Sequence, residues 1–398
     1  ASCKVTAANY RAGGISGCVS EHSVNAIKNC FFYYNSSEAI SAPCYAGAIV
    51  GELREGTISN CYYSSADVAK DGNGQVQNGV GNATTGSSTA DGSISGVQTV
   101  KKSSDQFKSG EVAWLLNNGV TDGTQAFYQT VNSNPYPYLS GKTVYYGYEN
   151  CGSTTKTYSN TNLSTTKPAH NYDNGFCKVC DAYQPATDSD GDGYVEIDNG
   201  GKLYWFAAQV NGGNTTLKAE LTKDIYVNKN VLNSEGELST GTYRQWTPIG
   251  NDTVKYSGIF DGGNYTVSGL YFNDTTVKYV GLFGQTASGS EIKNVGVIGS
   301  YFEAKQDIGA VVAVCYGTIT NCYNTSSVIS TGNYIGGVCG HLLAGSITEC
   351  YNSGTYGTIR RCLFDSKEYA LKEFKDPFYL VGKRWKLSSL EYVDRKEL

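Results

Sequence analysis

An internal repeat constrains the fold of this chain more than any other feature. Five stretches each hold a Gly-rich apolar strand, a short turn and a Gly-x-Ile-x-x-Cys-Tyr segment or a close relative: residues 10–33, 45–63, 279–297, 307–324 and 334–352. The isoleucine recurs as Ile27 and Ile58, and again as Ile292, Ile319 and Ile347, the last three 27 and then 28 residues apart. A unit this short cannot bury its own apolar face, so its copies must stack on one another.

The repeat predicts an all-β fold: a right-handed parallel β-helix (solenoid) in two stretches, joined by a small metal-binding connector. Strand alternation places Ile319 and Cys322 in the interior and polar residues outside. With 48 Gly, 32 Tyr and 17% charged residues, the composition suits strands and turns. A propeller is disfavoured because a four-stranded blade needs about 40–45 residues.

Several motifs resemble a known family. VGLFG at 280–284 and IGGVCG at 335–340, followed by ITNCYN or ITECYN, resemble the GLUG-motif repeats of bacterial surface proteins. Residues 246–272 resemble the segment that precedes such repeats, and residues 105–119 with 126–139 resemble the segment that follows them. The resemblance implies a β-helical, adhesin-like or secreted protein without a defined activity. It covers most of residues 10–150 and 188–352.

The repeat and the changes in composition divide the chain into five parts. The chain has no Met and begins inside a repeat, so we expect it to be a piece of a longer protein. The charged tail differs from the rest, because 14 of residues 367–398 are charged. The expected parts are terminal coils of a first β-helix (1–66), an excursion and end cap (67–150), a Cys/His connector (151–187), a calcium loop, capping helix and second β-helix (188–362), and the tail (363–398).

Two short helices are expected at the ends of the solenoids. Phe107, Val112 and Leu116 would share one face of a helix over 105–117, which Ser103 or Ser104 could cap. Its role would be to seal the last coil, since a solenoid needs a covered end. Residues 201–210 are expected to form an amphipathic helix that caps the second β-helix.

The connector carries the residues of a closed zinc site. Cys151, His170, Cys177 and Cys180 follow the spacing Cys-x18-His-x6-Cys-x2-Cys. Three thiolates and one imidazole complete a tetrahedral Zn²⁺ site with no open position, so the role would be structural, a zinc knuckle between the β-helices. The alternative is one or two disulfides, which an extracellular location favours.

The acidic run DSDGDGYVEIDN at 188–199 follows the pattern of a calcium-binding loop. Gly193 permits the sharp turn. Asn199 occupies the place of the usual bidentate acid, so either Glu196 or Asp198 is expected to compensate, with a weaker affinity than a full site. A solvated acidic turn is the alternative. The expected Ca²⁺ ligands are Asp188, Asp190, Asp192, the Tyr194 carbonyl, Glu196 and Asn199.

The remaining polar residues favour a non-catalytic role. The net charge of −5 gives no electrostatic case for nucleic acid, and no run of 18 apolar residues predicts a membrane span. His22 and His341 fall in expected turns, and no Ser/His/Asp set or phosphate loop can be identified, so we expect no enzyme. Most of the 13 cysteines recur inside strands, where stacked buried thiols are expected.

We therefore expect a secreted or cell-surface, adhesin-like binding or stalk protein. Its partner would be a host or microbial surface glycan or protein, or copies of itself. One alternative is an extracellular filament subunit, because the open ends of a β-helix can template assembly. The other is a β-helical polysaccharide-degrading enzyme, which would need carboxylates facing one another. Tyr62, Tyr323 and Tyr351 follow the repeat cysteine and are expected to form stacked ladders or an aromatic binding face.

Overall fold

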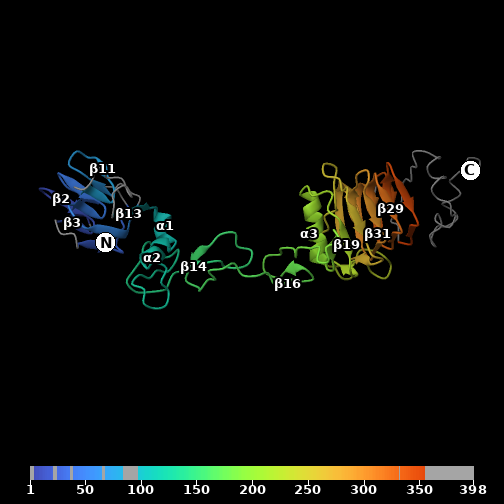
Figure 1. Ribbon diagram of the computed structural model, residues 1–398, viewed down its shortest axis with the longest axis horizontal. Coiled ribbons are helices and arrows are strands. Elements are labelled where there is room, and N and C mark those ends of the chain that lie inside the picture. Colours follow the sequence, from blue (N-terminus) through green and yellow to red (C-terminus); the bar gives the residue numbers. More distant parts are fainter. Residues whose placement is uncertain are drawn as a thin grey trace, which may run out of the picture. The chain divides into compact units, whose positions relative to one another are not determined.

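The computed structural model confirms the β-solenoid and divides the chain into two compact units, residues 1–169 and 170–398 (Figure 1). Each unit builds its coils from parallel strands that pair between successive turns of the chain. Among the described residues, no helix is long and apolar enough to cross a membrane. The structure describes residues 4–20, 25–35, 39–64, 68–83, 97–330 and 332–354.

The first unit stacks its coils through four small sheets. The pairing is parallel except for the final β10–β11 pair. The sheets are β1 (Val5–Thr6), β6 (Ile40–Ser41), β10 (Ala69–Lys70) and β11 (Val76–Gln77); β2 (Arg11–Gly13) and β7 (Tyr45–Gly47); β3 (Ser16–Val19), β8 (Val50–Leu53) and β12 (Val80–Ala83); and β4 (Ala26–Lys28), β5 (Phe31–Phe32), β9 (Thr57–Ser64) and β13 (Val97–Lys102).

The surface excursion expected at the start of the 67–150 part is wrong for residues 68–83 and 97–102, which the structure describes. β10, β12 and β13 continue the coil sheets, and Val80 lies opposite Val50 while Val97 lies opposite Ile58. The strands here are short and lie between residues rich in Gly, Ser and Thr, so their apolar pattern is weak in the sequence. Residues 84–96 lie outside the described residues.

A pair of short helices follows the last coil of the first unit, in place of one continuous helix. They are α1 (Ser104–Lys108) and α2 (Glu111–Leu116), and Gly110 breaks the helix between them with φ 92°. Ser103 caps α1 as expected, in a reciprocal capping box with Gln106. The buried faces of both helices pack on Tyr62 of β9, so they cover that coil. Beyond them, β14 (Tyr145–Gly147) pairs antiparallel with β15 (Thr157–Ser159).

The second unit begins with a hairpin and a helix. β16 (Tyr172–Asp173) and β17 (Phe176–Cys177) form the hairpin. Helix α3 (Gly200–Asn211) buries Leu203, Phe206 and Val210. The Phe206 ring lies 5.8 Å from those of Tyr256 and Phe260, so α3 packs on the first coils of the solenoid.

Four sheets run through the second solenoid, and every strand pair in them is parallel. The sheets are β18 (Val195–Ile197), β19 (Ala219–Leu221), β21 (Ile259–Asp261), β25 (Glu291–Lys293), β29 (Thr318–Thr320) and β34 (Ser346–Thr348); β20 (Ile225–Tyr226), β22 (Thr266–Ser268), β26 (Gly296–Ile298), β30 (Tyr323–Asn324) and β35 (Tyr351–Asn352); β23 (Tyr271–Val280), β27 (Tyr301–Gly309), β31 (Ser327–Ser330) and β32 (Ile335–Gly336); and β24 (Phe283–Gln285), β28 (Val312–Cys315) and β33 (Cys339–Leu342).

The core is a set of side-chain columns that run from coil to coil. Ile292, Ile319 and Ile347 are register partners, as the repeat predicted, and the column continues to Phe260. Phe260, Ile292 and Ile319 are fully buried. His341 is not in a turn as expected, because it lies in β33. The charged tail and His22 lie outside the described residues.

An asparagine ladder marks one corner of the coils. Asn264, Asn294 and Asn321 all have φ between 52° and 65°, a left-handed conformation that asparagine tolerates better than most residues. Asn321 donates to the side chain of Asn294 at 2.9 Å, and Asn294 donates to Asp261 at 2.9 Å. In the first unit, Asn60 donates to Asn29 at 2.8 Å. The ladder combines a required backbone conformation with side-chain bonds between coils.

Asn294→Ala should therefore destabilise the second unit by about 2–5 kcal/mol. The change removes two side-chain hydrogen bonds, each worth about 0.5–1.5 kcal/mol, and places alanine at a φ that costs it about 1–2 kcal/mol. Asn294→Gly is the matched control, because it loses the bonds without the backbone penalty. Chemical unfolding followed by Trp fluorescence measures both variants. An alanine variant as stable as the glycine variant would contradict the conformational part of this account.

Candidate metal centres

The Cys/His group of the connector is organised by two tight turns. Asn174 and Gly175 have φ of 46° and 78°, which suits the two-residue turn that joins β16 to β17. After Cys177, the amide of Asp181 donates to the Cys177 carbonyl at 3.0 Å. This second turn folds the chain back and brings Cys180 beside Cys177.

The structure brings all four predicted zinc ligands together. The sulfurs of Cys151, Cys177 and Cys180 and a ring nitrogen of His170 lie within 4.8 Å of one another. Cys180 Sγ lies 3.3 Å from His170 Nδ1. Cys151 and Cys177 are each only 3% exposed, so the group has a shielded side. These residues could hold a metal ion.

Tetrahedral geometry gives a check on this arrangement. Two thiolates that each lie about 2.3 Å from Zn²⁺ are about 3.8 Å apart. The four atoms therefore need only a small contraction to reach coordination distances. The donor set of three sulfurs and one nitrogen suits a soft or borderline cation such as Zn²⁺ better than Mg²⁺ or Ca²⁺.

Arg244 supports the second turn, and sequence reasoning missed it because it lies far along the chain. Its guanidinium donates to both carboxylate oxygens of Asp181, at 2.7 and 2.6 Å. The same guanidinium lies 4.0 Å from the centre of the Phe176 ring. The hydrogen bonds from Arg244 lower the pKa of the Asp181 carboxyl. The bidentate contact holds the turn directly after Cys180.

The acidic loop before β18 forms a second group of candidate ligands. Carboxylate oxygens of Asp188, Asp190 and Glu196 lie within 4.8 Å of one another. The amides of Gly191 and Gly193 donate to Asp188 at 2.7 and 2.9 Å, so the chain wraps around that carboxylate. This group, too, could hold a metal ion.

Glu196 is fixed from within the loop. Its Oε1 accepts hydrogen bonds from the Ser189 amide at 2.8 Å and the Ser189 hydroxyl at 2.7 Å. These bonds lower the pKa of Glu196 and keep it ionised.

Of the other predicted calcium ligands, Asp192 is not among the three gathered carboxylates, and Asn199 has a further role. Asp192 accepts from the amide of Tyr194 at 2.8 Å. Asn199 is the N-cap of α3, where its Oδ1 accepts from the Lys202 amide at 2.9 Å and its Nδ2 donates to Asp198. The side chain of Asn199 therefore caps the helix that follows the loop. The role of the Tyr194 carbonyl stays a prediction.

Glu220 is a further acidic residue beside the loop. It lies directly opposite Glu196 in the parallel pair β18–β19. Burial raises the pKa of Glu220, and the charges of Asp192, Asp190, Glu196 and Asp261 add to the rise. Like charges on adjacent strands repel one another, which a cation at the loop would relieve. Only the strand register reveals this neighbour, because Glu220 belongs to no local motif.

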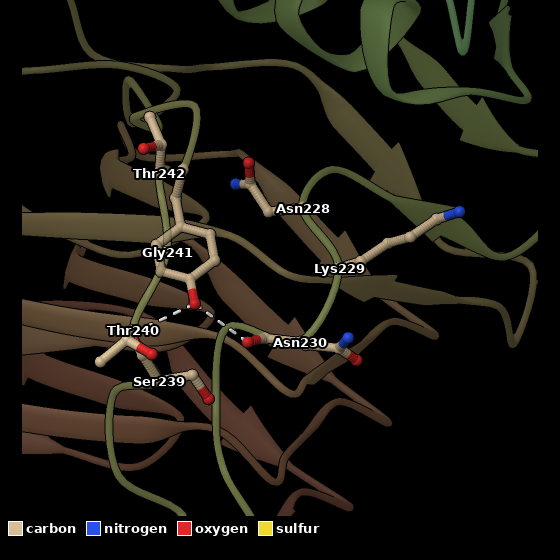
Figure 2. Close-up of a pocket in the computed structure, with 8 residues that line it drawn as sticks. Asn228, Lys229, Asn230, Ser239, Thr240, Gly241 and Thr242 are labelled. Atoms are coloured by element: carbon tan, nitrogen blue, oxygen red, sulfur yellow. Dashed lines mark hydrogen bonds between the residues drawn. The ribbon is translucent and has the colours of Figure 1, made fainter.

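A polar recess opens elsewhere on the second unit, between the loops that carry Asn228–Asn230 and Ser239–Tyr243 (Figure 2). Its volume is about 410 Å³. Asn228 accepts from the Arg244 amide at 2.7 Å, and the Tyr243 hydroxyl donates to the Asn230 and Ser239 carbonyls at 3.1 and 3.2 Å. Several of the lining side chains thus hold the loops in place.

Comparison with known proteins gives short partial similarities. The chain matches no protein-family model and no solved structure. It is 32% identical over 79 residues to a Gly-rich membrane protein of Evansella cellulosilytica, a match that covers 19% of this chain and 9% of that protein. It is 28% identical over 123 residues to halomucin of Haloquadratum walsbyi, covering 30% of this chain and 1% of halomucin. The matches thus span a small fraction of the length of these curated relatives.

Proposed function

We propose that this chain is a non-catalytic module of a secreted or cell-surface protein, acting as a stalk or binding segment with an adhesin-like role. The observation that carries the proposal is the solenoid itself. Its coils are short and repetitive, and each contacts its neighbours along the chain. Such an architecture provides length and a repeated outer surface.

The partial matches support a surface location. One matched protein is named as a Gly-rich membrane protein and the other as halomucin. The similarity to GLUG-motif repeats points the same way. Neither match extends over enough of either chain to transfer a partner or ligand.

Tyr323 and Tyr351 stack on each other, which favours binding of a partner through polar groups over stacking of sugar rings on these aromatic side chains. The rings of Tyr323 and Tyr351 are 4.8 Å apart and parallel to within 2°. Each ring therefore covers one face of its neighbour. A sugar that stacks on an aromatic needs an open ring face. Surface glycan or protein partners would thus be contacted through hydroxyls, amides and the polar recess.

We further propose that the Cys/His group holds a structural Zn²⁺ ion. The four donor atoms already lie together, and the hairpin that carries two of them has few large buried side chains. A small segment of this kind gains its stability from a staple. A bound Zn²⁺ with four protein ligands has no open position, so it would stabilise the fold rather than react.

For the acidic loop we propose Ca²⁺. Its donors are carboxylate oxygens, which hard cations prefer. Asp188, Asp190 and Glu196 supply the ligands, and Glu220 adds negative charge from the neighbouring strand. Weak extracellular calcium sites have Kd values of about 10⁻⁴ to 10⁻³ M, so this site would be about half to nine-tenths occupied at millimolar calcium.

The proposed function predicts that the protein is secreted or exposed on the cell surface and that it degrades no polysaccharide. An antibody raised against the full chain should label intact cells of the source organism or detect the protein in the medium. On a glycan array the chain should bind saturably or not at all, and in parallel incubations it should shorten no polysaccharide. Labelling only after permeabilisation would contradict the location. New reducing ends above those of a heat-inactivated control would instead support the polysaccharide-degrading enzyme.

Zinc analysis tests the connector. The purified chain should contain about one zinc per molecule, and Cys177→Ser should lower this to below about 0.2, because three ligands bind far more weakly than four. Cys44→Ser is the matched control, since Cys44 is exposed and outside the group. Wild-type protein with almost no zinc and a disulfide at Cys177 would overturn the zinc proposal.

Calcium should raise the melting temperature of the second unit. At ten times Kd the gain is about 1.4 kcal/mol, or about 3 °C for a unit of this size. Asp190→Ala should abolish the shift, and Glu235→Ala, which removes an exposed charge elsewhere, should not. Asp192→Ala should leave most of the shift if the three-residue group is the site. An unchanged melting curve between chelator and excess calcium would leave only a solvated acidic turn.

A further inference from the structure

Two pairs of cysteines face one another across neighbouring coils. The Tyr62 amide donates to the Cys30 carbonyl at 2.9 Å, and Phe31 lies opposite Tyr62, so Cys30 lies opposite Cys61. In the second unit, Tyr323 lies opposite Tyr351, which places Cys322 opposite Cys350. The same arrangement therefore occurs once in each solenoid.

Both thiols of each pair point in the same direction. Each donates to the carbonyl two residues before it, at distances from 3.1 to 3.3 Å: Cys30 to Lys28, Cys61 to Ser59, Cys322 to Thr320 and Cys350 to Thr348. The amide of Cys322 also lies 3.4 Å from Cys350 Sγ. The sulfurs of a pair are thus neighbours with matching rotamers.

The spacing of parallel strands suits a bond between such thiols. Neighbouring strands lie about 4.8 Å apart, and the Cα atoms of disulfides are about 4.4–6.8 Å apart. To form the bond, the Cβ atoms would have to approach by about 1 Å, to about 3.8 Å, and one thiol would have to rotate about its Cα–Cβ bond, because two parallel Cβ–Sγ bonds cannot give the dihedral of about ±90° that a disulfide needs. The resulting strain makes the bond easier to reduce than an unstrained one.

We propose that Cys30–Cys61 and Cys322–Cys350 are oxidisable dithiol sites, which form disulfides between coils by exchange with a low-molecular-weight disulfide. This function was not expected from the sequence, where the recurring cysteines were assigned to stacked buried thiols. A disulfide is neutral and apolar, so it suits the coil interior. It also closes a loop of about one coil and thereby restricts the unfolded chain.

The exposure and the pKa of the two thiols indicate which cysteine of the Cys322–Cys350 pair reacts first with the external disulfide. Cys350 is partly exposed while Cys322 is buried. The hydrogen bond with Cys322 lowers the pKa of Cys350 and raises that of Cys322. The Cys350 thiolate attacks the external disulfide, forms a mixed disulfide and releases one thiolate. Cys322 then loses its proton to solvent and attacks the Cys350 sulfur, which releases the second thiolate. Two protein thiols are oxidised, and one external disulfide is reduced to two thiols.

The other pair should react more slowly. Burial raises the pKa of Cys30 and raises that of Cys61 to about 11, so neither thiol is readily ionised. The difference in rate between the pairs follows from the thiolate fraction of the more exposed cysteine.

Peptide mapping of the full chain tests the proposal. The reduced protein is incubated with oxidised glutathione, alkylated and digested without reduction. Chymotrypsin cleaves after Phe31, Tyr45 and Leu53, which separates Cys30, Cys44 and Cys61 from one another. It also cleaves after Tyr323 and Leu343, which separates Cys322 from Cys350. We expect both linked peptides, with Cys322–Cys350 appearing first. Exposed Cys44, which faces no cysteine, should carry glutathione instead.

Melting curves give a second readout. Oxidation should raise the melting temperature by about 5–10 °C, and dithiothreitol should reverse the rise. Cys350→Ser should remove only the Cys322–Cys350 peptide and its share of the rise. The proposal would be overturned if the cysteines of both pairs were recovered as separate peptides, each alkylated or carrying glutathione, with no linked peptide. The test supplies its own oxidant, so its result does not depend on the surface location, although the role of the bonds in the natural protein does.

Discussion

The parallel backbone ladder between consecutive coils is the interaction on which the rest of this structure depends. Each coil is too small to bury its apolar residues alone, so the columns through Ile292 and Ile319 exist only where the next coil continues them. The same ladder aligns identical positions at one strand spacing. Asparagines meet asparagines, tyrosines stack and cysteines pair because the register repeats.

Open ladder ends have unpaired amides and carbonyls that can pair with another chain. In the second unit, α3 packs Phe206 onto the first coils of the solenoid. In the first unit, the two short helices lie on the flank of the coils instead, because β9 is paired on one edge with β13 and on the other with β4 and β5. There Asn60 donates to the Leu115 carbonyl of α2 at 2.8 Å.

The candidate metal centres lie in segments that are not part of the repeating coils. The hairpin around Cys177 and the loop around Asp188 contain few apolar residues and no repeat, so stacking cannot stabilise them. Their turns instead rely on glycines, on the ion pair of Asp181 with Arg244, and on carboxylates that gather backbone amides. Cation binding at such places is a compact way to hold a chain segment without a core.

Local sequence information determined the coil period, the inward isoleucines, the Ser103 cap, and the ligand types of the two metal groups. These depend on alternation, spacing and turn chemistry, which act over a few residues. Only the tertiary structure placed Glu220 beside Glu196, made Asn199 the N-cap of α3, and showed that β10, β12 and β13 belong to the coils. It also set Cys30 opposite Cys61. These contacts depend on the register between strands separated by a whole coil, and coils of unequal length hide that register from the sequence.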